Sequence, residues 1–182
     1  MKVSYIVAGL ASATAMIGMG AAAHAETLAV NTTVAPYCGI RLANVSSGTA
    51  SVAQEAEQQV ANLELACNSG GTAQLVVNPL NGDFKNGNAL INYAMRLTVP
   101  SESAFDIGPT DATPGDVEGS GKFTRNKVGY SQPLANGVAA GFYLNVNVAA
   151  PGPAPLGQTF YPANAAPAGT YSESFTFTLT AI

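Results

Sequence analysis

The sequence predicts an all-β protein, and three features of the chain support this class. Several segments alternate apolar and polar residues with a period of two, which is the pattern of half-buried strands. Clusters of Gly, Pro, Asn and Asp separate these segments and mark turns. Charged residues make up only 10% of the chain, whereas Thr, Ser, Asn, Gly and Ala are abundant, as in many extracellular β-proteins. Short strands, turn clusters and two cysteines favour a β-sandwich with Greek-key connections.

The first 25 residues have the features of a secretory signal peptide. Lys2 supplies the positive charge, an apolar stretch follows over 3–22, and Ala23-His24-Ala25 fits the small-x-small cleavage pattern. A membrane anchor is the alternative. The small residues of the stretch and the lack of a basic flank favour cleavage before Glu26, with no stable membrane insertion afterwards.

The remaining 157 residues suit one domain with a sizeable core. Six basic residues face 11 acidic ones after residue 25, which argues against nucleic acid or anionic membranes as partners. The only histidine, His24, leaves with the signal peptide. This excludes Ser-His-Asp and Cys-His catalysis and His-ligated metal sites, so we expect no enzyme, no cofactor and no metal.

The strands expected from alternation can be placed in chain order. The first runs over 27–34, with Leu28, Val30, Thr32 and Val34 on one face. The segment 54–60 could be helical by composition, and 122–128 could form a short strand. The connections 100–136 and 149–169 are rich in Gly and Pro and are expected as surface loops. Further strands are predicted at 39–45, 58–67, 72–77, 89–99, 141–148 and 170–182.

Two cysteines remain after the signal peptide, Cys38 and Cys67. A single pair in an exported protein implies a disulfide, with two free thiols as the alternative. Closing a loop of about 30 residues stabilises the fold by roughly 3–4 kcal/mol in the chain-entropy treatment.

The last predicted strand lacks an obvious partner. Its apolar face carries Tyr171, Phe175, Phe177 and Leu179, and no later segment of the sequence can pair with it. A long unpaired edge strand in a secreted protein is an aggregation hazard. The strand 27–34 also lacks an obvious partner, because only Ala35-Pro36-Tyr37 separate it from Cys38 and so short a segment does not easily reverse the chain direction. Both ends of the chain therefore carry a predicted strand without a partner.

These residues resemble those of chaperone–usher pilins. The shared features are an alternating N-terminal extension, a cysteine at the start of the first strand and a second cysteine closing the next. The ending Pro167-Ala-Gly-Thr-Tyr-Ser-Glu-Ser-Phe-Thr-Phe-Thr-Leu-Thr is similar to that of the spore-coat-U-like, archaic Csu-type group, and so is Ile91-Asn-Tyr-Ala-Met-Arg-Leu.

The resemblance implies an incomplete immunoglobulin-like β-sandwich completed by a donor strand from a neighbouring subunit. Residues 26–36 would be the donor extension and linker, and 37–182 the pilin domain. By resemblance, Leu28, Val30, Thr32 and Val34 insert, while Phe175, Phe177 and Leu179 line the acceptor groove on the C-terminal strand that also carries Tyr171. Partners would be related subunits, a periplasmic chaperone and an outer-membrane usher. The fibre would stand on the cell surface and serve adhesion or biofilm.

Three other interpretations compete with this resemblance. Asp106, Asp111, Asp116 and Glu118 could bind Ca²⁺ or act as paired carboxylates, but no metal-loop spacing is present and a solvated acidic loop is favoured. A sugar-stacking surface of Tyr93, Tyr130, Tyr143 and Tyr161 is disfavoured against ordinary packing. The alternative function is a secreted β-sandwich module that binds, for example, carbohydrate.

Overall fold

The computed structural model describes residues 31–45, 50–51, 56–112, 121–146, 148–150 and 152–182. The chain divides into two units, Met1–Val34 and Ala35–Ile182. In the first unit only 31–34 are described, and they are exposed and form no helix or strand. The predicted signal peptide and the donor positions Leu28 and Val30 lie outside the described residues.

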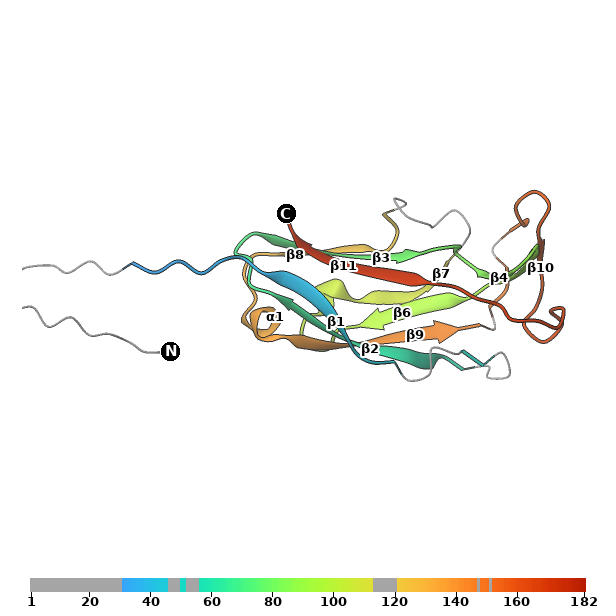
Figure 1. Cartoon of the computed structure of the whole chain (residues 1–182), viewed down its shortest axis with the longest axis horizontal. Helices are drawn as coiled ribbons and strands as arrows, with labels where there is room; N and C mark the ends of the chain where they lie inside the picture. The colour runs from blue at the N-terminus through green and yellow to red at the C-terminus, as the bar shows by residue number, and fades with distance from the viewer. Residues whose placement is uncertain (1–30, 46–49, 52–55, 113–120, 147, 151) are drawn as a thin grey trace, which may run out of the picture. The chain divides into compact units, whose positions relative to one another are not determined.

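The second unit is all-β, as the alternation predicts (Figure 1). Its largest sheet, sheet A, is antiparallel and has the strand order β1-β2-β9-β6-β7. Its strands are β1 Cys38–Val45, β2 Gln58–Cys67, β9 Val138–Asn145, β6 Ala94–Thr98 and β7 Ile107–Asp111.

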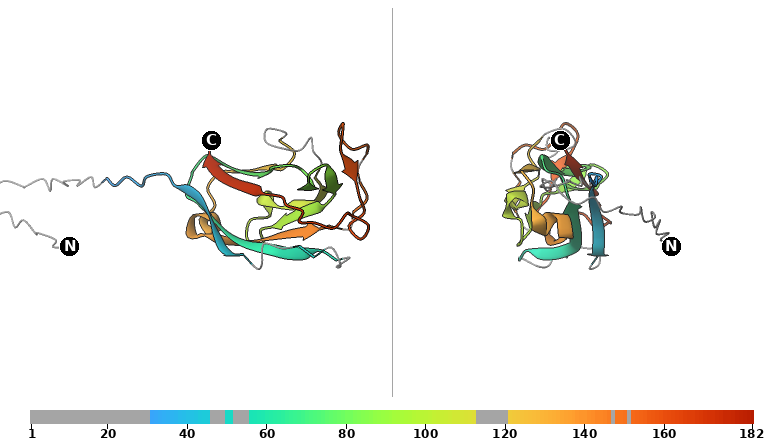
Figure 2. Two further views of the ribbon diagram at one scale, coloured as in Figure 1. Left: turned by 45° about the vertical axis from the view of Figure 1, so that its right-hand side comes forward. Right: turned by 90° about the vertical axis from the view of Figure 1, so that its left-hand side faces the viewer.

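Two smaller sheets complete this unit. Sheet B is antiparallel, with the order β11-β3-β8, and comprises β11 Phe175–Ala181, β3 Thr72–Pro79 and β8 Thr124–Val128. Sheet C has the order β10-β5-β4 and comprises β10 Thr159–Phe160, β5 Ala89–Ile91 and β4 Phe84–Asn86. Figure 2 shows sheets A and B as two facing layers.

One hydrophobic core lies between sheets A and B, which is consistent with a β-sandwich. Strands β2 and β3 show why these sequences fold this way, because every second residue from Leu63 to Cys67 and from Ala73 to Val77 is buried while the residues between are partly exposed. Burial of apolar area of this kind is the main favourable term in folding. The largest fully buried side chains include Tyr93, Phe105, Phe123, Leu63, Leu65, Leu75, Met95 and Leu97.

The predicted strand over 89–99 is in fact two strands in different sheets. β5 ends at Ile91 and β6 begins at Ala94. Between them the Asn92 Nδ2 group donates to the Ala149 carbonyl at 3.0 Å, and the Tyr93 carbonyl accepts from the Ala112 N–H at 3.1 Å. These loop contacts replace the ladder while the chain crosses from sheet C to sheet A. Every residue from Leu90 to Met95 is buried, so the apolar positions Ile91, Tyr93 and Met95 of the predicted strand stay inside although the chain changes sheets.

The two expected loops also carry short elements. The connection 100–136 contains β7, β8, the 3-10 turn η1 Ser103–Phe105 and the helix α1 Gln132–Asn136, whose first turn is capped by the Ser131 hydroxyl accepting from Leu134 N–H at 3.4 Å. The connection 149–169 contains β10. The helical alternative for 54–60 is wrong where it can be judged, because Gln58–Val60 belong to β2. Among the described residues, no helix is long and apolar enough to cross a bilayer.

Candidate functional site

Sheets A and B meet along two seams, and one of them is closed by side chains. On the side of β7 and β8, Arg125 Nε donates to the Asp106 carbonyl at 3.0 Å, and Lys122 Nζ donates to the Asp111 carbonyl at 2.5 Å. The fully buried Phe105 of η1 fills the space between the layers there. The two basic side chains thus bind backbone carbonyls at β7 that could otherwise accept hydrogen bonds from an added strand.

The opposite seam, between β1 and β11, is open. These strands approach each other near the start of β1 and the end of β11 and then diverge, as both views show (Figures 1 and 2). The space between them is a groove of about 190 Å³. Its lining is almost entirely apolar and comes from both layers: Leu42, Ala50, Val60, Ala61, Phe84, Phe142, Leu144, Glu173, Phe175 and Phe177.

Aromatic rings form one wall and the floor of this groove. Phe175 and Phe177 of β11 both pack edge-to-face on Phe142 of β9, with ring centroids 4.8 and 5.1 Å apart. Phe175 also meets the fully buried Tyr93 at 5.6 Å. Edge-to-face pairs at these distances contribute about 0.5–1.5 kcal/mol each beyond area burial. The wall is therefore fixed in place, while Phe175 and Phe177 remain only partly buried.

Both strands that border the groove have a free edge. Among the described residues, β1 pairs only with β2 and β11 pairs only with β3. Each strand therefore directs a row of backbone N–H and C=O groups toward the gap. Such groups are costly when they are buried without a partner. An apolar floor between two free edges is the geometry that accepts an added strand.

Glu173 closes the groove at the end where β11 begins. Its carboxylate accepts from the backbone N–H groups of Leu80 and Asn81, each at 3.0 Å, and of Ser174 at 2.7 Å. Tyr93 Oη donates weakly to it at 3.5 Å. The carboxylate thus ties the turn after β3 to the first residues of β11. Glu173 belongs to the ending motif of the sequence, but alternation alone assigns it no role.

Asn68 fixes the chain just before β1. Tyr37 N–H donates to Asn68 Oδ1 at 2.6 Å, Asn68 Nδ2 donates to the Ala35 carbonyl at 3.0 Å, and Asn68 N–H donates to the Tyr37 carbonyl at 2.9 Å. These bonds extend the β1–β2 ladder beyond Cys38. Ala35–Tyr37 are therefore held in line with β1 up to the first residue of the unit.

The expected disulfide is confirmed. Cys38 and Cys67 are bonded, and they are directly paired residues of β1 and β2. The bridge anchors β1 at its first residue. At its other end β1 carries a register shift between Leu42 and Asn44. One end of the groove-forming strand is therefore covalently held, and the other depends on its ladder alone.

The structure distributes the predicted site residues as follows. Phe175 and Phe177 line the groove, whereas Leu179 is buried further along the same face of β11. Tyr171 precedes the strand and donates through its hydroxyl to the Pro167 carbonyl at 3.1 Å. Thr32 and Val34 are exposed. Sequence reasoning missed the groove residues of sheet A, because alternation marks them only as core: Leu42, Val60, Ala61, Phe142 and Leu144.

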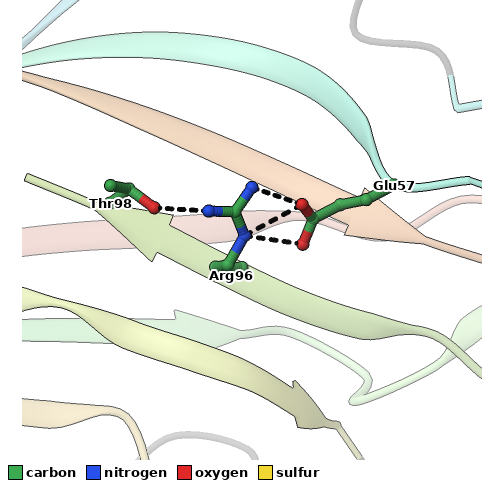
Figure 3. A network of polar contacts seen from close by, with 3 residues as sticks. All are labelled: Glu57, Arg96 and Thr98. Atoms are coloured by element: carbon green, nitrogen blue, oxygen red, sulfur yellow. Dashed lines mark hydrogen bonds and ion pairs between the residues drawn. The ribbon is translucent and has the colours of Figure 1, made fainter.

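Charged groups gather on the outer face of sheet A, away from the groove. Arg96 of β6 binds Glu57 through Nε at 2.8 and 2.9 Å and through a second guanidinium nitrogen, and it donates to Thr98 Oγ1 at 2.9 Å (Figure 3). The guanidinium lies 4.3 Å from the centroid of Tyr143. Hydrogen bonding to Glu57 raises the pKa of Arg96, and Glu64 raises that of Arg41 in the same way. Both arginines remain charged at any relevant pH.

The other sites weighed from the sequence do not come together in the described residues. Asp106 Oδ1 accepts from the Val99 N–H at 2.6 Å, and no cluster of three or more potential metal ligands occurs in this part of the chain. Asp116 and Glu118 lie outside the described residues. The tyrosines form no common surface, since Tyr93 is fully buried, Tyr143 lies under Arg96 and Tyr130 is exposed.

Comparison of the chain with profiles of protein families, with curated proteins and with solved structures found no match.

Proposed function

We propose that this chain is a structural subunit of a surface pilus or fimbria, and that its domain is an immunoglobulin-like sandwich lacking one strand. The observation that carries the proposal is the apolar groove between the free edges of β1 and β11. A neighbouring subunit would fill it with its N-terminal extension. Main-chain hydrogen bonds to both edges would supply affinity, and alternate side chains would occupy the groove.

The extension has the length and pattern that this groove requires. Eight residues, 27–34, span roughly 26 Å when extended, and the seven residues of β11 span roughly 23 Å. Leu28, Val30, Thr32 and Val34 alternate with smaller or polar residues. A strand with one apolar face would place that face on Phe142, Phe175 and Phe177. Its polar face would lie in solvent.

Asn68 favours insertion into a neighbour over insertion into the same molecule. For the extension to enter its own groove, the chain would have to reverse within Ala35–Tyr37. That reversal would break the three hydrogen bonds that Asn68 makes with this segment. Pro36 further restricts the backbone at the same place. A partner molecule can supply its extension without this cost.

Because the groove of a single subunit is unfilled, we expect the subunit to require a chaperone and an usher for assembly. Free strand edges above exposed apolar side chains promote aggregation. A periplasmic chaperone would cover β1 and β11 after export, and an outer-membrane usher would exchange the chaperone for the next subunit. The mature chain would thus pass through the periplasm to the cell surface. The disulfide is compatible with such an oxidising compartment.

The test is to supply the missing strand within one chain. β11 ends where it comes close to β1, so a copy of 27–35 appended after Ile182 through a short Gly/Ser linker would turn back and run antiparallel to β11 toward the groove. A protein beginning at Pro36 should self-associate or unfold, and the appended strand should turn it into a stable monomer. The matched control carries the same appendage with Leu28→Asp and Val30→Asp, and it should not rescue.

A stable, well-folded monomer without any appendage would refute the missing strand. The alternative, a secreted β-sandwich binding module, would then be favoured. One feature suits that alternative, a pocket of about 140 Å³ near β5 that is lined in part by Phe160, Tyr161 and Asn92. Glycan-array screening of the monomer would test it.

A further inference from the structure

Among the described residues, the outer face of sheet B carries no charged side chain. Ten residues of β3, β8 and β11 alternate with the buried ones and form this face, which we call the neutral face. The registers Thr180–Gln74–Asn126 and Thr178–Val76–Thr124 run straight across it. Its members are Thr72, Gln74, Val76, Asn78, Thr124, Asn126, Val128, Thr176, Thr178 and Thr180.

This face differs from the rest of the molecule. The whole chain has a formal charge of −4, and the outer face of sheet A carries Arg96, Glu57, Arg41 and Glu64. Net charge normally keeps soluble proteins apart, and exposed sheet surfaces usually mix charges of both signs. Arg125 and Lys127 of β8 are paired with the buried residues Leu75 and Ala73, so they belong to the other side of sheet B and not to the neutral face.

We propose that the neutral face is a lateral contact between copies of this chain in adjacent fibres. Two acidic molecules repel each other least where neither presents a charge. Threonine hydroxyls and the Asn and Gln amides both donate and accept, so the same face can satisfy a second copy of itself. The face holds no aromatic ring on which a sugar could stack, which favours a second copy over a polysaccharide.

The size of the face decides when this contact forms. Three strands about 4.8 Å apart and seven residues long cover roughly 330 Å² per partner, or roughly 650 Å² per pair. Stable specific interfaces bury about 1,200–2,000 Å². Single subunits should therefore stay apart, and the contact should become effective only when it repeats along two fibres. The inference rests on the proposed fibre function in this respect.

Two matched glutamines allow a sharp test. Gln74 lies at the centre of the neutral face and donates through Nε2 to Asn126 Oδ1 at 3.1 Å, while Gln59 of β2 is exposed and donates likewise to Asn62 Oδ1 at 2.5 Å. Gln74→Glu and Gln59→Glu are near-isosteric and add the same charge. Fibres of the full chain would be sheared from cells, purified, and examined by electron microscopy and low-speed sedimentation. Fibre length would be followed separately through SDS-resistant ladders.

We expect wild-type and Gln59→Glu fibres to lie side by side in bundles. Gln74→Glu fibres should have equal length but at least fivefold fewer filaments per bundle. Raising the salt from 0.1 to 1 M shortens the screening length from about 10 to about 3 Å and should restore bundling of Gln74→Glu. Equal bundling by both variants, or bundling only after polysaccharide is added, would overturn the lateral contact and leave the fibre function intact. Absence of any ladder in the wild type would overturn both.

Discussion

A substitution at Leu42 can separate two quantities: the stability of the domain itself and the affinity with which the proposed strand inserts into its groove. It lines the groove from β1, yet it is 55% exposed when the groove is empty. Fully burying a leucine contributes about 1.5–3 kcal/mol, so roughly half of this remains to be gained when a strand covers it. Leu42→Ala should therefore weaken strand insertion by about 1 kcal/mol, which is roughly fivefold in affinity.

The measurement compares unfolding in urea with and without the appended strand. In the unmodified chain at high dilution, Leu42→Ala should lower the free energy of unfolding by only about 1 kcal/mol, because about half of the side chain is already in water. In the self-complemented chain the loss should be larger by about 1 kcal/mol. Leu80→Ala is the control, because Leu80 is 67% exposed and does not line the groove. Equal losses in both forms, or an equally large effect of Leu80→Ala, would refute the reasoning.

Three further changes test the groove and its supports. Val30→Asp should abolish fibres, because an unpaired carboxylate would enter an apolar groove, whereas Ala29→Asp on the opposite face should be much milder. Electron microscopy of surface fibres compares the two variants, and equal assembly by wild type and Val30→Asp would refute the donor role. Glu173→Ala should destabilise the domain by about 2 kcal/mol in urea, since the N–H groups of Asn81 and Ser174 lose their acceptor and that of Leu80 keeps only the Ser174 carbonyl. An unchanged midpoint would contradict this role. Replacing both cysteines with serine should lower the free energy of unfolding by roughly 3 kcal/mol. The mass of the wild type should rise by two units on reduction, and alkylation of two thiols in the native protein would disprove the bridge.

Period-two alternation predicted most of the strands because burial follows the pleat. β2 has the expected bounds, and the expected β1 and β3 differ from the observed strands by one or two residues. The same signal failed at Asn92 and Tyr93, because inner residues remain buried when a chain passes from one sheet to another. Alternation reports which residues face a core and carries no information on which strand lies alongside.

The same limit applies to the groove. Alternation places Phe175 and Phe177 on the apolar face of the C-terminal strand, and the resemblance to pilins implies a groove there. Leu42, Val60 and Phe142 come from distant strands and meet only through the packing of the two sheets. Nor could the sequence assign Asn68 a role. Its three hydrogen bonds depend on Ala35 and Tyr37 lying beside it across the disulfide-linked pair of strands.

Under the proposed function, the difference between the two seams would limit how many neighbours one molecule can join. In the described part of the chain, Lys122 and Arg125 bind carbonyls along one seam, and the space for an added strand between sheets A and B lies on the side of β1 and β11. A unit with one groove and one extension would join at most two neighbours, one through each. The assembly would then be an unbranched chain with a direction, and one end would present an empty groove. The two basic side chains that close one seam would thus decide between a linear polymer and a branching network.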